Sequence, residues 1–259
     1  VCGHSVKYYT PKESLFDIFH TYGPDVLYSN SYSLDSQTIK VLQKYNNTKV
    51  ILRANDWGNH LKDIGTEYPI GRVSQAEIEA VELLKKTIGD RLSFVFTHYH
   101  PNQIPITMHG WTDHLGIPAI GLNNSCDIFS YYGGSIKSEL ECDVSFIGGF
   151  WPYKSVNLKP FIFPLCQKEK NLNIKIFGNG VWPVGQYLGM LSEDNVKNLF
   201  VSSKINLNIH EPHSRKFGQD VVERPMKILG GGGFCISDHV KSCEEDYFNN
   251  DEIITAQAP

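Results

Sequence analysis

The chain has 259 residues, of which 41% are hydrophobic, 20% charged and 12% aromatic, and its formal net charge is -4 with histidine neutral. This composition is typical of a soluble globular protein with one large domain or two small ones. The acidic balance and the lack of a basic tail argue against nucleic acid as the main partner, because phosphate neutralisation requires clustered Lys and Arg.

Apolar runs such as the stretch at 160–166 are far too short to cross a bilayer, so no transmembrane segment is expected. The six cysteines show no close pairing of the kind that binds a metal. We therefore expect free, buried thiols and a cytoplasmic protein, with a set of disulfides as the alternative. Val1 is not an initiator methionine and no signal peptide is visible, so a fragment of a longer protein is an open interpretation.

The first half alternates strands and helices. In chain order, the expected elements are a strand at 4–9, a helix at 14–20, a strand at 25–29, a helix at 36–45, a strand at 49–54, a helix at 74–88, a strand at 92–97, a helix at 104–115 and a strand at 117–122. The helix at 74–88 is the clearest, because Ser74 and Glu77 form a capping box before an apolar stripe. The alternation predicts an α/β domain with a mostly parallel sheet and right-handed crossovers. One strand–helix unit is expected to be missing before His4.

Two groups of polar residues in the first half are candidate site residues. Asn55 and Asp56 follow the strand at 49–54, where a polar strand-end loop is either functional or a simple turn. The four histidines at 98, 100, 109 and 114 do not share one helical face, and no acidic residue completes a set of ligands. We expect them to be polar loop residues and expect no metal site there.

The segment 123–142 is polar, carries Gly133 and Gly134 and shows no periodicity, so we interpret it as the connection between two domains. After it, the expected elements are a strand at 143–147, a helix at 157–166, a strand at 173–177, a helix capped by Ser192, a strand at 204–209, a charged loop at 210–218, a helix with Pro225 in its first turn, and a strand at 234–237. Pro160 and Pro164 leave the limits of the first of these helices open.

Three phrases in the second half place glycines or a cation at the end of a strand or beside a helix terminus: SFIGGFWPYK (145–154), IFGNG (176–180) and QDVVERPMKILGGGGFCISD (219–238). Such positions bind phosphate-bearing ligands in α/β domains, because helix N-termini present free N–H groups and partial positive charge. Pro225 has no N–H and belongs in the first turn of its helix, so Glu223, Arg224 and Lys227 gather at the N-terminal end. The four glycines at 230–233 follow this helix and are expected to end it.

The order of these phrases along the chain is strand–GG…K, strand–GxG, a helix beginning S-E-D, strand–NLNIHE, then ERPMKILGGGGF. This order resembles the donor-binding domain of GT-B glycosyltransferases. The likeness is to glycosyltransferase family 4 and its spore-maturation-type relatives, whose signature is roughly R-x-F-E-x-x-x-x-G-G-F. It covers most of the second half and is thinner in the first. The phrase at 124–129 also resembles the N-G-V-D…F phrase with which such enzymes cross between domains.

The resemblance implies an α/β fold of two Rossmann-like domains whose parallel sheets face across a cleft. Residues 1–124 would be an N-terminal acceptor-side domain that lacks its first strand, residues 125–142 the interdomain linker, and residues 143–259 a C-terminal nucleotide-sugar-binding domain that lacks its C-terminal helix. It also implies a retaining transfer of a sugar from a nucleotide diphosphate donor, with GDP-mannose as the first guess, to a glycan or other hydroxyl acceptor. No cofactor and no metal are expected, and a homodimer is left open.

The family's residues carry over only in part. Its G-R-x-x-x-x-K phrase places the Lys on the donor diphosphate, and this Lys corresponds to Lys154, whereas Gly149 stands where the family has Arg. The expected catalytic residues are Asn55, Asp56 and Lys154. The expected donor-binding residues are Gly148, Gly149, Lys154, Gly178, Glu211, Glu223, Arg224 and Lys227.

The family's pair of donor-binding Glu residues can be aligned in two ways. Aligned on the closing glycine, the pair falls on Gln219 and Lys227; aligned on the Phe-Gly at 217–218, it falls on Arg215 and Glu223. The two alignments differ by one helical turn, so Glu223 and Lys227 share a face. We favour Glu223 for the ribose hydroxyls and Arg224 or Lys227 for phosphate.

Two other functions remain as alternatives. A sugar-nucleotide epimerase has the same two-domain shape, and a non-catalytic two-lobed sugar-binding protein or an inactive transferase would keep the fold without the reaction. A binding protein is expected to carry a secretion signal and to lack a cationic phosphate site, so Lys154 and the helix of Arg224 argue against it. Release of nucleoside diphosphate from a panel of donors would separate the three.

Overall fold

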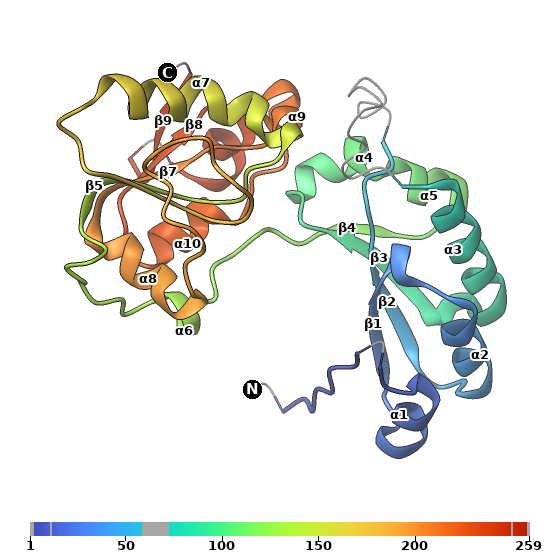
Figure 1. Cartoon of the computed structure of the whole chain (residues 1–259). Coiled ribbons are helices and arrows are strands. Elements are labelled where there is room, and N and C mark those ends of the chain that lie inside the picture. Colours follow the sequence, from blue (N-terminus) through green and yellow to red (C-terminus); the bar gives the residue numbers. More distant parts are fainter. Residues whose placement is uncertain (1–2, 11, 59–72, 250, 258–259) are drawn as a thin grey trace. The chain divides into compact units, whose positions relative to one another are not determined.

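The computed structural model describes residues 3–10, 12–58, 73–249 and 251–257. The chain divides into two compact units, Val1–Leu122 and Asn123–Pro259, both drawn in Figure 1. Each unit contains one parallel sheet with helices packed on it, as the alternation of strands and helices predicts. The two units are described separately.

The N-terminal unit has a four-stranded sheet in the order β1-β2-β3-β4, and all three strand pairs are parallel. Its elements are α1 (Leu15–Tyr22), β1 (Val26–Asn30), η1 (Ser31–Ser33), α2 (Ser36–Lys44), β2 (Lys49–Arg53), α3 (Gln75–Ile88), η3 (Gly89–Arg91), β3 (Leu92–Thr97), η4 (Pro101–Gln103), α4 (Ile104–Thr107), α5 (His109–Leu115) and β4 (Ala119–Gly121). The helices and strands expected between residues 14 and 97 are therefore confirmed to within two residues.

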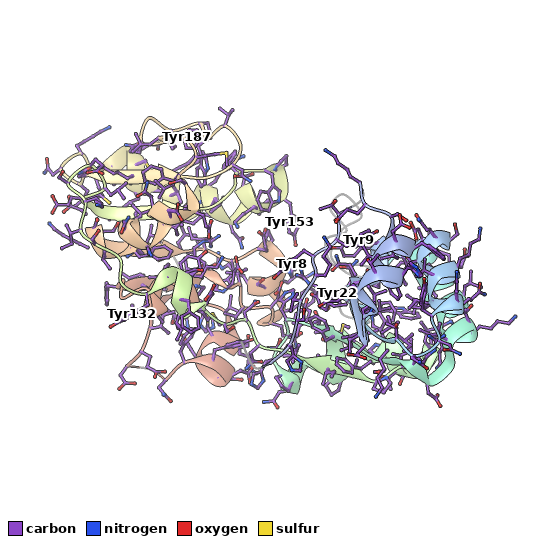
Figure 2. All side chains as sticks on the ribbon, turned by 90° about the horizontal axis from the view of Figure 1, so that it is seen from below. Tyr8, Tyr9, Tyr22, Tyr132, Tyr153 and Tyr187 are labelled. Atoms are coloured by element: carbon purple, nitrogen blue, oxygen red, sulfur yellow. The ribbon has the colours of Figure 1, made fainter. Side chains whose placement is uncertain are left out.

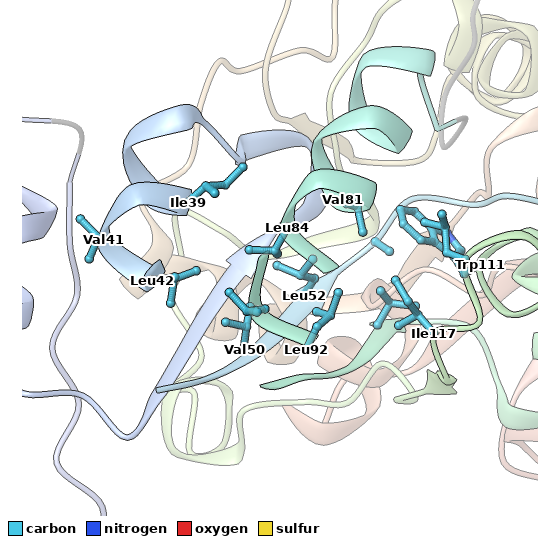
Figure 3. Packing of buried hydrophobic residues seen from close by; sticks show 14 of the residues in the cluster. Ile39, Val41, Leu42, Val50, Leu52, Val81, Leu84, Leu92, Trp111 and Ile117 are labelled. Carbon is cyan, nitrogen blue, oxygen red and sulfur yellow. The ribbon is translucent and has the colours of Figure 1, made fainter. Parts of the chain in front are cut away.

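Apolar side chains of α2 and α3 pack on one face of this sheet and bury it. Leu42 from α2 and Leu84 from α3 are fully buried together with Val50 and Leu52 from β2, as the close view in Figure 3 shows. Burial of each such side chain contributes about 1.5–3 kcal/mol to the free energy of unfolding. This core fixes the carboxyl end of β2, which carries the candidate residues Asn55 and Asp56.

Two expectations for this unit are wrong. Residues 4–9 form no strand, because Val6 and Tyr8 are 69% and 85% exposed and leave no apolar face to join the sheet. This stretch is held instead by the Tyr22 hydroxyl, which donates to Ser5 Oγ at 2.9 Å (Figure 2). The expected helix at 104–115 is two helices that separate at Met108.

The expected capping box at Ser74 and Glu77 is half correct. Ser74 Oγ accepts the backbone N–H of Glu77 at 3.1 Å, as an N-cap should. The Glu77 carboxylate does not return the bond; it is buried and accepts hydrogen bonds from the Ser31 hydroxyl and from Asn55 Nδ2. Packing against β1 and β2 has therefore redirected this side chain from its helix to the sheet.

The C-terminal unit has a five-stranded parallel sheet in the order β6-β5-β7-β8-β9. Its elements are α6 (Ile128–Tyr131), β5 (Cys142–Ile147), α7 (Pro152–Lys168), β6 (Ile174–Phe177), α8 (Glu193–Ser202), β7 (Ser203–Asn208), α9 (Pro212–Phe217), α10 (Arg224–Gly230), β8 (Cys235–Asp238), the π-helical turn η5 (Cys243–Tyr247) and β9 (Ile254–Ala256). Helix α7 covers one face of the sheet, and α8 and α10 cover the other (Figure 1). Because β6 and β7 flank β5 on opposite sides, the strand order reverses at β5, where open α/β sheets bind ligands.

Helix α7 begins five residues earlier than expected and contains both Pro160 and Pro164. Each proline removes a backbone N–H donor from the helix interior. The helix persists because Leu158 and Ile162 are completely buried against β5 and β6, so packing outweighs the lost hydrogen bonds. Its early start places Lys154 in the first turn.

The charged segment at 210–218, expected to be a loop, contains α9. Pro212 occupies the first turn of this helix, and Gly218 ends it with φ of 72°, a conformation that favours glycine. The connection at 123–142 contains the short helix α6, and β9 extends the sheet beyond the last strand expected.

The five cysteines within the described residues (Cys126, Cys142, Cys166, Cys235 and Cys243) are free, as expected. No helix in the described part of the chain has the length and apolar character needed to cross a bilayer.

Candidate functional site

A cavity of about 380 Å³ lies within the C-terminal unit, beyond the carboxyl ends of β5 and β6. Its walls come from the loops after these strands, from α8 and the segment just before it, from the N-terminal end of α10, and from α6. The cavity is lined by Tyr131, Ile147, Gly148, Gly149, Gly178, Asn179, Met190, Leu191, Glu193, Val196, Phe200, Val222, Glu223, Arg224 and Lys227. Six of the eight expected donor-binding residues thus surround one space.

Arg224 contributes positive charge to this cavity. Its Nη1 donates to Asn208 Oδ1 at 2.8 Å and to the carbonyl oxygen of Ile209 at 3.3 Å, and its guanidinium lies 5.1 Å from the ring centre of Phe146. These contacts fix the plane of the guanidinium at the carboxyl ends of β5 and β7. The remaining N–H groups can therefore present a fixed fork to an anion, the geometry that suits phosphate.

Glycine is required where the backbone approaches Arg224. A Cβ atom on Gly148 would lie 3.0 Å from Arg224 Nη2 and 2.9 Å from Phe146 Cε1, so a side chain there would displace the guanidinium. Gly178 has φ of 140°, and a Cβ there would lie 2.0 Å from the carbonyl oxygen of Gly148. The loop after β5 and the loop after β6 therefore pack closely against each other at Gly148 and Gly178. Both glycines line the cavity.

Lys154 and Glu211 form a buried ion pair next to Arg224, outside the lining of the cavity. Lys154 Nζ lies 3.2 Å from Glu211 Oε1, with the side chains 5% and 12% exposed. Burial and the nearby charge of Arg224 lower the pKa of Lys154 to about 8, although the Glu211 carboxylate opposes this shift. The lysine follows β5 and the glutamate follows β7, so the ion pair spans the position where the strand order reverses.

A row of polar contacts crosses the cavity wall from α10 to α8. Lys227 Nζ lies 2.6 Å from Glu223 Oε1 and 5.1 Å from the ring centre of Tyr131. The Tyr131 hydroxyl in turn donates to Glu193 Oε1. Glu223 is 60% exposed and makes no side-chain cap for α10, so its carboxylate is accessible from the cavity.

Cys243, His210 and Asp238 are arranged like a nucleophile, a base and an orienting acid. His210 Nδ1 lies 2.7 Å from Asp238 Oδ1, and Cys243 Sγ lies 4.0 Å from His210 Nε2. All three side chains are buried, and burial raises the pKa of the Cys243 thiol to about 12. A thiol in this state is not a nucleophile at neutral pH, so the cluster is structural. The sequence alone does not reveal this cluster, because the three residues come from separate segments.

A second buried histidine holds the first turn of α7. His213 Nε2 lies 2.6 Å from Asp220 Oδ2, and His213 Nδ1 lies 3.0 Å from the Tyr153 hydroxyl. Asp220 has φ of 64°, which is rare outside glycine, so the surrounding contacts define its conformation. Tyr153 precedes Lys154 in the chain and is labelled in Figure 2. This network therefore fixes Tyr153, and with it the backbone that carries the buried Lys154.

The expected catalytic residues Asn55 and Asp56 belong to the N-terminal unit. Asn55 Nδ2 donates to Glu77 Oε2 at 3.2 Å, and its carbonyl oxygen accepts the indole N–H of Trp111 at 2.9 Å. Asp56 is 5% exposed and accepts a hydrogen bond from the Tyr99 hydroxyl. Both residues are held by partners inside their unit, and their catalytic role stays a prediction.

Across the described residues, no group of three or more His, Cys, Asp or Glu side chains is arranged to hold a metal ion. The expectation of a reaction without a metal stays a prediction.

Residues 157–259 match a protein-family model described as glycosyl transferase-like. Among solved structures, a sucrose-phosphate synthase from Thermosynechococcus elongatus is similar with a TM-score of 0.55 at 9% identity, over 95% of this chain and 67% of that one. Anabaena HepE in complex with UDP is similar with a TM-score of 0.58 at 12% identity, over 93% of this chain and 66% of that one. A second HepE structure, with UDP and glucose, gives a TM-score of 0.55 at 12% identity over the same shares.

This chain thus spans about two thirds of the length of these structures. A comparison with curated protein sequences finds no match. At these identities the similar structures show a shared α/β fold with parallel sheets, and the glycosyl transferase-like match covers most of the unit that contains the cavity. Together these comparisons support a transferase enzyme.

Proposed function

We propose that this chain is a GT-B glycosyltransferase that binds a nucleotide-sugar donor in the cavity of its C-terminal unit. The observation that carries the proposal is the fixed guanidinium of Arg224 at the glycine-walled carboxyl end of β5. The fold, the glycosyl transferase-like match and the UDP bound to the structurally similar HepE support it. The likeness to family 4 and its spore-maturation-type relatives adds the expectation that the sugar is transferred with retention of configuration.

The reaction breaks the bond between the donor sugar and the diphosphate, and the diphosphate leaves with growing negative charge. Donors that are already oriented stabilise such charge without reorganising, which is often the largest catalytic term. Arg224 is oriented by Asn208 and by the carbonyl of Ile209, and Lys154 adds a second positive charge close by. In this proposal the two cations replace the metal ion that would otherwise meet the leaving group.

Glu211 stabilises the charged form of Lys154. A buried ammonium with no carboxylate beside it would lose its proton, because desolvation disfavours the charged form. The ion pair at 3.2 Å retains the charge up to a pH of about 8. We assign Glu211 as the residue that positions Lys154 and Arg224 as the residue that contacts the diphosphate.

Release of nucleoside diphosphate from GDP-, UDP- and ADP-sugars, with and without glycan acceptors, tests the proposed activity directly. Arg224→Met should weaken binding of the diphosphate by about 1.5–3 kcal/mol, the range for hydrogen bonds to charged groups, or roughly 10- to 150-fold in Kd. Lys204→Met is the matched control, because Lys204 is an exposed cation on β7 that pairs with Asp143. Equal affinities of the two variants would refute the site, and absence of release from every donor would refute the activity.

A further inference from the structure

The polar side chains of the cavity are linked by a series of contacts that begins at Glu223, the neighbour of Arg224 in the chain, and ends at Glu193. Glu223 precedes Arg224 in the chain, Lys227 Nζ lies 2.6 Å from Glu223 Oε1, and Lys227 also lies over the Tyr131 ring at 5.1 Å. The Tyr131 hydroxyl donates to Glu193 Oε1 and completes the series. Three contacts therefore separate the carboxylate of Glu193 from Glu223, the residue adjacent to Arg224.

In a nucleoside diphosphate the ribose lies between the phosphates and the base. Its three parts can therefore follow the series of polar side chains from Arg224 to Glu193. If the diphosphate lies at Arg224, as the proposed function requires, the ribose comes next to Glu223 and the base reaches the end where Glu193 lies. The walls there are apolar and are formed by Leu191 and Val196, which line the same cavity. Apolar walls suit the faces of a base, and a single polar group at its edge then determines which base is accepted.

We propose that Glu193 selects a donor whose base carries two neighbouring N–H donors on one edge, which is the edge of guanine. An ionised carboxylate only accepts hydrogen bonds, and its two oxygens match the N1–H and the 2-amino group of guanine. Uracil presents one N–H between two carbonyl oxygens, which would face the carboxylate unfavourably. Adenine presents one amino group beside an acceptor nitrogen, so it could use one carboxylate oxygen.

Tyr131 is the positioning residue for this selection. Its hydroxyl donates to Oε1 of Glu193, so the orientation of the carboxylate is set before a ligand enters. Each carboxylate oxygen accepts about two hydrogen bonds, so both oxygens keep room for a base. Tyr131 lies in α6 and Glu193 begins α8, so two separate elements determine where the carboxylate points.

Glu193 also has a simpler explanation as an acid in the first turn of α8, where it complements the helix dipole. Asp194 is the neighbouring acid in the same turn, but it is absent from the lining of the cavity. The two residues therefore share the dipole role, but only Glu193 lines the cavity and accepts the hydrogen bond from Tyr131. Asp194→Asn is consequently a matched control for Glu193→Gln.

The test measures the Kd of the whole chain for GDP, IDP, ADP and UDP by titration calorimetry. The wild type should prefer GDP over UDP by about 10- to 100-fold, the discrimination of a good bidentate contact to a base. IDP lacks the 2-amino group and should fall between the two. Glu193→Gln replaces one acceptor by a donor, which opposes guanine and suits uracil, so this variant should lose GDP affinity and gain UDP affinity. Asp194→Asn should keep the wild-type order.

The outcomes separate this proposal from the proposed function on which it rests. Binding of GDP and UDP with equal affinity, both weakened by Arg224→Met, would overturn the role of Glu193 and leave the donor site intact. A uniform loss of all four ligands in Glu193→Gln would do the same, because it would show a structural effect. Failure of the wild type to bind any of the four would overturn the donor site and the base selection together.

Discussion

Glu211→Gln should destabilise the C-terminal unit by an amount that depends on pH. Glutamine keeps the size of the side chain and removes the negative charge 3.2 Å from Lys154 Nζ. Lys154 would then be buried next to Arg224 with no carboxylate at this distance, and its pKa should fall well below the wild-type value of about 8. Lys154 can then lose its proton, because the neutral form tolerates burial better than the charged form. The free energy of unfolding therefore falls by no more than the cost of neutralising this lysine.

The limit follows from the wild-type pKa of about 8. At pH 6 the charged form of Lys154 is favoured over the neutral form by about 3 kcal/mol, since each pH unit below the pKa adds about 1.4 kcal/mol. At pH 8 the two forms are almost equally populated, so forcing the neutral form costs less than about 1 kcal/mol. The charge contribution to the destabilisation should therefore decrease from about 3 kcal/mol at pH 6 to below about 1 kcal/mol at pH 8.

The sign agrees with proton linkage. The pKa of Lys154 is lowered on folding, so the unfolded chain binds more protons above pH 8, and stability from this group rises with pH up to the ordinary lysine pKa of 10.5. In Glu211→Gln the folded pKa is lower, so the same rise begins at a lower pH. The variant therefore recovers towards the wild type between pH 6 and pH 8.

Urea unfolding at pH 6, 7 and 8, followed by tryptophan fluorescence and far-UV circular dichroism, measures this difference. Glu245→Gln is the matched control, because Glu245 pairs with Lys241 at 3.5 Å on the exposed surface of the same unit. That change should cost less than about 1 kcal/mol at every pH. The double variant Glu211→Gln Lys154→Met should lose the pH dependence. An equal destabilisation by Glu211→Gln at pH 6 and pH 8 would refute the coupling of the two charges.

The site leads to four further predictions. Lys154→Ala should weaken binding of the nucleoside diphosphate by about 1.5–3 kcal/mol in calorimetry, and unchanged affinity would limit Lys154 to its ion pair with Glu211. The affinity of the wild type for the diphosphate should fall above pH 8 as Lys154 loses its proton, whereas a flat profile to pH 9.5 would exclude this lysine from binding. EDTA should leave sugar transfer intact, and restoration of a lost activity by magnesium or manganese would contradict the metal-free mechanism. Glu223→Gln should reduce the preference for ribose over 2′-deoxyribose donors with little change in Tm, and unaltered discrimination would transfer the ribose role to Lys227.

Most of the fold could be predicted because it depends on local patterns. Alternating strands and helices predicted parallel sheets in both halves, and the capping signal at Ser74 located α3. The charged residues of α9 favour a loop, although Pro212 and Gly218 mark the two ends of a helix. Pro152 marks the start of α7 in the same way, because proline fits the first turn of a helix.

The length of α7 shows where local patterns fail. Pro160 and Pro164 argue against a continuous helix through this segment on propensity alone. The structure keeps the helix because its other face is buried on β5 and β6, and that burial depends on strands elsewhere in the chain. Tertiary packing of this kind leaves no mark within the helix sequence itself.

The candidate site was predictable to the extent that its residues are close in sequence. Glu223, Arg224 and Lys227 lie within one phrase, and the structure brings them to one cavity. Their partners come from distant segments: Tyr131 and Glu193 are 62 residues apart, and the partner of Lys154 follows a different strand. The pairing of Lys154 with Glu211 depends on the order β6-β5-β7, which places the ends of β5 and β7 side by side. Lys154 follows β5 and Glu211 follows β7, so the two side chains meet only because these strands are neighbours in the sheet. Once they are paired, the charge of Glu211 affects the pKa of Lys154.

The pairing with Glu211 changes what Lys154 can do in the reaction. As an isolated residue it would carry a full charge at every physiological pH, with the ordinary lysine pKa of 10.5. Beside Glu211 and Arg224 its pKa is about 8, so it is charged at neutral pH while remaining close to its titration range. An incoming diphosphate would raise this pKa by adding negative charge, and the lysine would hold its proton most firmly when the leaving group is present. In the proposed reaction Lys154 would therefore carry its full positive charge while the diphosphate leaves.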